Sequence, residues 1–171
     1  MTQIILADLS DPSHARAVLH LLNEYATDCM GGGEELSGHT RKHLIAELGK
    51  RVGCRVVLAF IDGLPAGLAI CFENFSTFLC APILNIHDFT VAPEFRGRGL
   101  SKQLLAKVEE IAKKTACCKI TLEVLEGNTI ARAVYSKFGF EGYELDPEMG
   151  KALFYEKKLG TNVSPEKSVR S

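Results

Sequence analysis

The stretch TVAPEFRGRGLSKQLL, Thr90 to Leu105, constrains the fold more than any other part of the chain. A β-favouring segment runs into Pro93, two glycines flanked by arginines follow, and an apolar helical pattern begins directly after them. This order predicts a strand, a tight turn and a helix whose first backbone amides have no intrahelical acceptor. Glycine lets an anion approach the main chain, and the positive end of the helix dipole points the same way. The turn is therefore a candidate phosphate site.

Arg96 and Arg98 can add charge-assisted hydrogen bonds to phosphate oxygens bound at this turn. Spacing excludes a P-loop, because no GxxxxGK followed by Ser or Thr occurs in the chain. The dinucleotide fingerprint GxGxxG also fails, because Lys102 stands at the third glycine position. A tight turn with solvated arginines and no ligand is the alternative that this stretch alone leaves open.

Composition bounds the class of protein. The chain has 171 residues, 46% hydrophobic and 24% charged, with a formal net charge of −1, which is typical of one soluble globular domain. Near-neutrality argues against a general nucleic-acid-binding surface. No apolar run reaches the roughly 18 residues of a membrane span, and the start has no signal-peptide pattern, so we expect no membrane association and a cytoplasmic location. The six cysteines form no CxxC pair, and we expect them to be reduced and no metal to be bound.

Hydrophobic periodicity predicts a single α+β domain over residues 1–159, followed by a polar tail, 160–171, that we expect to be disordered. The expected strands are Thr2–Leu6, two strands of a hairpin between Cys54 and Phe72 with Asp62-Gly63 at its turn, Leu84–Val91, Lys119–Glu126 and Ala152–Lys157. The expected helices are Pro12–Asp28, one around Leu44 to Leu48, one beginning near Gly99, and Asn128–Phe138.

A second constellation follows the turn by some thirty residues, in NTIARAVYSKFGF. It consists of Asn128, Ala131, Tyr135, Gly139 and Phe140. Together with Pro93 and the RxxGxS run from Arg96 to Ser101, this series resembles the GNAT family of acetyl-CoA-dependent N-acetyltransferases. The resemblance is close over residues 85–140, and residues 1–80 share only the order of elements.

The resemblance implies a mixed, mostly antiparallel central sheet of about six or seven strands flanked by about four helices. In this family the sheet splays at its parallel strand pair, which here would be Leu84–Val91 and Lys119–Glu126. Many relatives pair as dimers, so a homodimer is expected.

The resemblance also implies acetyl-CoA as cosubstrate, with its pyrophosphate on the amides of the turn and its pantetheine arm along the preceding strand. The residues that would bind it are Phe89, Val91, Arg96, Gly97, Arg98, Gly99, Leu100, Ser101, Asn128, Ala131 and Tyr135. Ser101 departs from the family's usual Gly or Ala, but it is small enough for the helix start. Asn128 is also a typical helix N-cap, and both roles are compatible.

Acetyl transfer to an amine requires a neutral nucleophile, a polarised carbonyl and a proton for the departing thiolate. Tyr135, with an ordinary pKa of about 10, is the predicted acid, as in family members that share the motif. NIHDFTV and FSTF resemble the diamine and polyamine acetyltransferase branch, which typically has glutamate at His87 and aspartate at Asp88. We expect these two side chains to point to opposite faces, with His87 as the base and Asp88 or a water as alternatives.

The predicted function is transfer of an acetyl group to a primary amine, most readily of a small molecule. In the loop after the first helix, Asp28, Glu34 and Glu35 are candidates to attract a cationic amine. The sequence leaves three alternatives open: an N-acetyltransferase of proteins or peptides, a non-catalytic acyl-CoA-binding module, and an unrelated phosphate-ligand protein.

Overall fold

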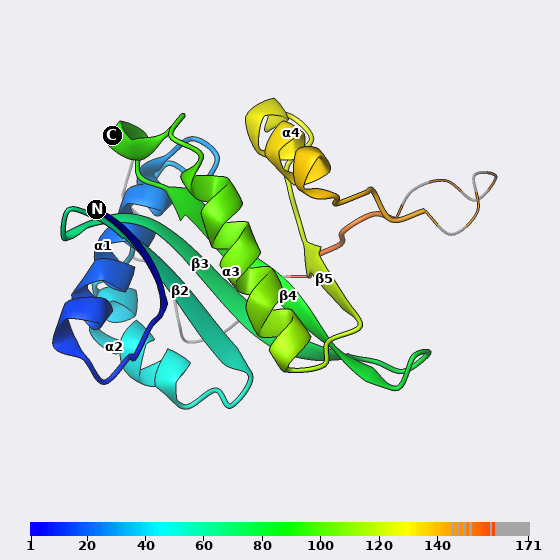
Figure 1. Ribbon diagram of the computed structural model, residues 1–171, viewed down its shortest axis with the longest axis horizontal. Coiled ribbons are helices and arrows are strands. Elements are labelled where there is room, and N and C mark those ends of the chain that lie inside the picture. Colours follow the sequence, from blue (N-terminus) through cyan, green and yellow to red (C-terminus); the bar gives the residue numbers. More distant parts are fainter. Residues whose placement is uncertain (145, 147, 149, 151, 158, 160–171) are drawn as a thin grey trace.

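A computed structural model describes residues 1–144, 146, 148, 150, 152–157 and 159 (Figure 1). In chain order its elements are β1 (Thr2–Leu6), α1 (Pro12–Thr27), α2 (Gly38–Gly49), β2 (Cys54–Ile61), β3 (Leu64–Ser76), β4 (Ala81–Val91), a 3-10 turn η1 (Pro93–Phe95), α3 (Leu100–Lys114), β5 (Lys119–Leu122) and α4 (Thr129–Phe138). The four predicted helices are confirmed.

The strands form one sheet in the order β1-β2-β3-β4-β5. The first three pairings are antiparallel, and β4 pairs with β5 in parallel. The predicted hairpin turn is present between β2 and β3, where Asp62 and Gly63 both have positive φ, 50° and 83°. That backbone matches the twist of the flanking strands.

Helices cover both faces of the sheet: α3 crosses one face, and α1 and α2 lie against the other (Figure 1). The N-terminus of α1 is capped by the Asp11 carboxylate, which accepts from the Ser13 amide at 2.7 Å, and Pro12 occupies the first turn. Close packing brings α3 onto β3 at Gly67, where a Cβ would lie 2.9 Å from Leu104 Cδ1 and 3.2 Å from the Thr90 carbonyl oxygen. The buried side chains of α1 are Ala17, Val18, Leu21 and Leu22. Those of α3 are Leu100, Leu104, Leu105, Val108, Ile111 and Ala112.

The expected sheet of six or seven strands is wrong for the part of the chain that is described, which has five. The segment predicted as a last strand, residues 152–157, is irregular and exposed, although one backbone bond joins the Ala152 amide to the Tyr143 carbonyl at 3.3 Å. β5 ends at Leu122 rather than at Glu126, so it pairs with only a short part of β4. An apolar pattern predicts a strand, but the strand needs a paired neighbour to form.

The predicted domain boundary after residue 159 and the predicted disorder of residues 160–171 lie outside the described residues. Within the described ones, every helix is too short or too polar to cross a lipid bilayer.

Candidate active site

The parallel pairing of β4 with β5 stops part-way along β4. It joins residues 83–86 of β4 to residues 119–122 of β5, and the side chains of Asn85 and Thr121 hydrogen-bond across it at 3.1 Å. Beyond Ile86, β4 continues to Val91 while β5 has already ended. The backbone of residues 87–91 therefore has β3 on one side and no strand of the described chain on the other.

The glycine turn lies at the open end of β4. Gly97 and Gly99 have φ of 77° and 73°, the left-handed region that glycine adopts most easily. The first bond at this helix start joins the Gln103 amide to the Gly99 carbonyl at 3.4 Å. Within the described chain, no group accepts from the six amides of residues 97–102. The turn thus presents a row of backbone donors at the positive end of α3.

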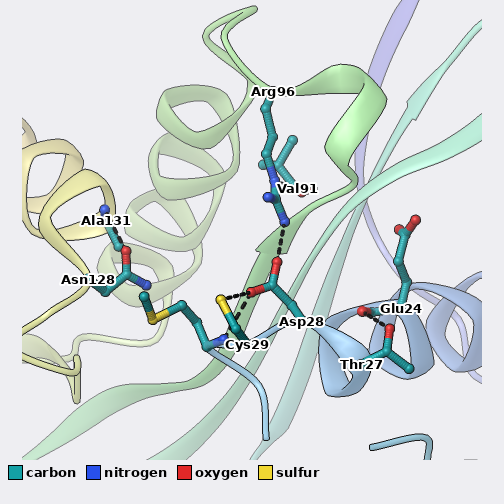
Figure 2. Close-up of polar contacts among 9 residues, drawn as sticks. Glu24, Thr27, Asp28, Cys29, Val91, Arg96, Asn128 and Ala131 are labelled. Carbon is teal, nitrogen blue, oxygen red and sulfur yellow. Dashed lines mark hydrogen bonds and ion pairs between the residues drawn. The ribbon is translucent and has the colours of Figure 1, made fainter. Parts of the chain in front are cut away.

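Arg96, which precedes this turn, bridges two segments far apart in sequence (Figure 2). Its Nε donates to the Val91 carbonyl at 3.0 Å, and its Nη2 donates to Asp28 Oδ2 at 3.0 Å. The other carboxylate oxygen of Asp28 accepts from the Met30 amide at 2.9 Å. The Met30 amide, and then Arg96, hold the pKa of Asp28 below its ordinary value. Arg96, expected to bind the phosphate, and Asp28, expected to attract the amine, are therefore bonded to each other. Nothing in the sequence indicates this contact.

Tyr135 lies on α4 beside the open end of β4. Its ring meets Phe89 edge-on at 5.9 Å and Phe140 at 5.8 Å between centroids. Burial, followed by the influence of Tyr25, raises the pKa of Tyr135 to about 12. The side chain is only 8% exposed, yet its hydroxyl oxygen is not sealed from solvent and has no hydrogen-bond partner among the described residues. It is a protonated donor available to a ligand.

Asn128 caps α4 as predicted. Its Oδ1 accepts from the Ala131 amide at 3.1 Å, as Figure 2 shows. The Nδ2 group of the same side chain makes no bond to the described part of the protein, so it stays available as a donor.

A β-bulge changes the predicted placement of His87 and Asp88. Asp88 pairs with Ile70, and the next pair is Ile86 with Cys71, so His87 has no residue opposite. Asp88 therefore shares a face with Ile70, and with Phe72 two residues further along β3. The His87 ring contacts that same Phe72, with centroids 5.6 Å apart. The two side chains lie on one face, and the expectation of opposite faces is wrong because a bulge shifts the alternation.

The environments of these two residues differ. His87 is exposed, whereas Asp88 is half-buried, and burial raises the pKa of Asp88 while the nearby His87 opposes that shift. Burial raises the pKa of Tyr25 on α1, and the negative charges of Asp88 and Asp28 raise it further. The regular spacing of NIHDF gives no sign of the bulge that creates this arrangement.

Two surface hollows of about 860 and 310 Å³ lie elsewhere, one between α2 and the ends of β1 and β2, the other between β5 and α4. Neither is lined by the turn or by Tyr135. The candidate site is therefore defined by the free edge of β4, the turn and Tyr135, and not by either hollow. Among the described residues no three His, Cys, Asp or Glu side chains group as metal ligands would.

The family model described as the acetyltransferase (GNAT) family matches residues 16–140, a span that runs from α1 through the turn to the end of α4. The chain belongs to the GNAT acetyltransferase family. Its fold is the GNAT fold, here with a five-stranded mixed sheet and four α-helices in the described residues, and the protein is an acetyltransferase.

Similar proteins include several amine acetyltransferases. An aminoglycoside N(6')-acetyltransferase type 1 of Salmonella typhimurium is 29% identical over 104 residues, 59% of this chain and 68% of the relative. A thialysine N-epsilon-acetyltransferase of Caenorhabditis elegans is 32% identical over 78 residues, 46% of this chain and 48% of the relative.

Solved structures share the fold over almost the whole chain. The aminoglycoside N-acetyltransferase AAC(6')-Iy in complex with CoA has a TM-score of 0.71 at 20% identity, covering 93% of this chain and 96% of that one. A GNAT family acetyltransferase of Staphylococcus aureus has a TM-score of 0.69 at 19% identity, covering 92% and 98%.

We predict that Asp88→Asn raises the stability of the protein at neutral pH. Burial places the folded-state pKa of Asp88 above its unfolded value, so the unfolded chain loses the proton first as pH rises. The folded protein therefore loses stability as pH rises between the two pKa values, and the loss stays constant above them. Asparagine carries no charge and removes this loss.

The measurement is the midpoint of thermal unfolding from pH 4 to pH 8. The difference between Asp88→Asn and wild type should be positive at pH 7 and shrink toward pH 4. Glu94→Gln, at an exposed carboxylate, is the control and should show no such trend. A lower midpoint for Asp88→Asn at pH 7 would contradict the prediction.

Proposed function

We propose that the protein transfers the acetyl group of acetyl-CoA to the primary amine of a small molecule. The observation that carries the proposal is the row of amides of residues 97–102 that no described group accepts from, at the open end of β4, with the Tyr135 hydroxyl, which no described residue bonds, on the neighbouring α4. A diphosphate supplies the acceptors that such a row needs. The CoA complex of AAC(6')-Iy, which has the same fold, supports this choice of ligand.

In this proposal the diphosphate of acetyl-CoA binds the amides of Gly97, Arg98, Gly99, Leu100 and Ser101, and Arg96 adds its charge. The pantetheine arm lies along β4 at Phe89 and Val91, where β5 no longer covers the strand. Asn128 Nδ2 and the first turn of α4, at Ala131, would contact the arm from the side away from β3. The cofactor thus takes the place of a strand between β4 and α4.

Tyr135 is the proposed acid. Its raised pKa keeps the phenol protonated at neutral pH, so it can donate to the sulfur of CoA as the carbon–sulfur bond breaks. The acetyl group moves to the amine nitrogen, and the proton of the phenol neutralises the thiolate that leaves.

Asp88 is the proposed base, in place of His87, which the sequence favoured. The half-buried carboxylate of Asp88 lies near Tyr25, which is in turn near Tyr135, and burial brings its pKa closer to neutrality. His87 is exposed and lies against Phe72 instead. The substrate class follows from the relatives, which are named for aminoglycosides and thialysine, both small amines.

We expect Gly99→Ala to weaken CoA binding by about tenfold or more, the cost of one lost charge-assisted hydrogen bond. A methyl group at φ 73° stands where an anion would approach the amides. The measurement is the Kd for CoA by titration calorimetry, with ATP as the comparison ligand.

The matched control is Gly63→Ala, at φ 83° in the β2–β3 hairpin, which carries similar backbone strain away from the turn. It should lose stability but keep its affinity for CoA. Wild-type protein that binds ATP as tightly as CoA would point to a general phosphate site and end the proposal.

Tyr135→Phe should lower kcat by about 10²- to 10⁴-fold, the usual contribution of a positioned acid, and leave the Kd for acetyl-CoA unchanged. The assay is release of free thiol with the best acceptor from a panel of amines, amino acids and polyamines. Tyr143→Phe, at a tyrosine that is 63% exposed, is the control and should retain full activity. An unchanged kcat for Tyr135→Phe would remove the acid role.

The base is tested by the dependence of rate on pH. Asp88 must be deprotonated to act, so kcat/KM should fall as pH falls through its pKa, and burial places this fall at a higher pH than for an ordinary carboxylate. Asp88→Asn should lose this limb of the profile along with most of the activity, and His87→Gln should keep it. Loss of the limb in His87→Gln would return the role to the histidine.

A further inference from the structure

The ion pair between Arg96 and Asp28 joins the two halves of the proposed site. Asp28 follows α1 directly, and Arg96 lies 68 residues later, immediately before the glycine turn (Figure 2). Asp28 thus begins the loop after α1, which holds the candidates to attract the amine, and Arg96 precedes the free amides of residues 97–102.

The ion pair between Arg96 and Asp28 is weak enough to be exchanged for another partner. A single contact, Nη2 to Oδ2 at 3.0 Å, holds it, and the two side chains are 52% and 22% exposed. Partly exposed pairs of this kind add little stability, whereas a diphosphate carries more charge and offers several oxygens to one guanidinium. A diphosphate on the adjacent amides is therefore the stronger partner for Arg96.

Tyr25 relates Asp28 to the proposed acid and the proposed base. Its amide donates to the Tyr25 carbonyl at 3.0 Å, which fixes it one turn from that tyrosine. Tyr25 also lies near Asp88, and Tyr135 lies near Tyr25. Without Arg96, the Asp28 carboxylate would keep only the Met30 amide and the Cys29 thiol as donors among the described residues, and its negative charge would have no cationic partner there.

We propose that Asp28 is the carboxylate that binds the ammonium group of the acceptor, and that Arg96 masks it until the cofactor's diphosphate takes the arginine. The inference rests on the proposed function and adds a residue that determines acceptor specificity. Because the two ligands then favour the same state, each strengthens binding of the other by an equal factor.

The first test measures the Kd for CoA in wild type, Asp28→Asn, Arg96→Gln and the double variant. Asparagine keeps the oxygen that the Met30 amide needs but no longer competes for Arg96 by charge. Asp28→Asn should therefore bind CoA about two- to fivefold more tightly than wild type, the scale of one partly exposed ion pair. In the Arg96→Gln background the same substitution should change the Kd by less than about 1.5-fold, because the charge competed for is gone.

The matched control is Glu35→Gln, at another carboxylate of the same loop that pairs with Arg41 at 3.0 Å. Its Kd for CoA should stay at the wild-type value. Weaker or unchanged CoA binding by Asp28→Asn overturns the masking by Arg96 and leaves the proposed function intact. Failure of wild-type protein to bind CoA at all overturns both.

The second test uses 1,5-diaminopentane as a cationic probe, titrated into free protein and into the CoA complex. Wild type should bind it at least about tenfold more tightly as the CoA complex, and the CoA complex of Asp28→Asn should lose that gain. Equal affinities in the two CoA complexes, or no binding to the wild-type complex, would remove Asp28 from the acceptor site.

Discussion

The short parallel pairing of β4 with β5 is the constraint on which the site depends. Because hydrogen bonding between them ends at Ile86 and Leu122, the last part of β4 keeps one edge free, and a ligand can take the place of a strand there. The glycine turn and the first turn of α3 also lack acceptors among the described residues, because they begin a helix. A longer β5 would pair with the remaining backbone of β4 and cover this edge, so the proposed site depends on the short β5.

Burial and hydrogen bonding set the protonation states of the ionisable groups around the proposed site. The buried phenol of Tyr135 stays protonated, the half-buried carboxylate of Asp88 is driven toward neutrality, and Asp28 is held ionised by the Met30 amide and Arg96. The pKa values of two aspartates are thus shifted in opposite directions, and the pKa of the tyrosine is raised. Tyr25 interacts electrostatically with Asp88, Asp28 and Tyr135, in each case less strongly than burial acts.

Most of the fold follows from local signals. The Asp-Gly hairpin, the proline at the start of α1, the glycines before α3 and the asparagine before α4 each mark a boundary that the structure contains. The number of strands does not follow, because residues 152–157 have the composition of a strand, yet no strand lies beside them in the described chain. Local residue preference favours an extended strand, but the strand forms only where a neighbouring strand pairs with it.

The sequence by itself determined the family, the glycine turn and the Asn128 cap, because these depend on residue types at fixed spacings within two short segments, residues 90–105 and 128–140. Only the tertiary structure decided that His87 and Asp88 share a face, since a bulge is defined by the pairing of two strands. It also decided that Arg96 faces Asp28 across 68 residues of chain. Both are relations between distant segments, and only packing creates them.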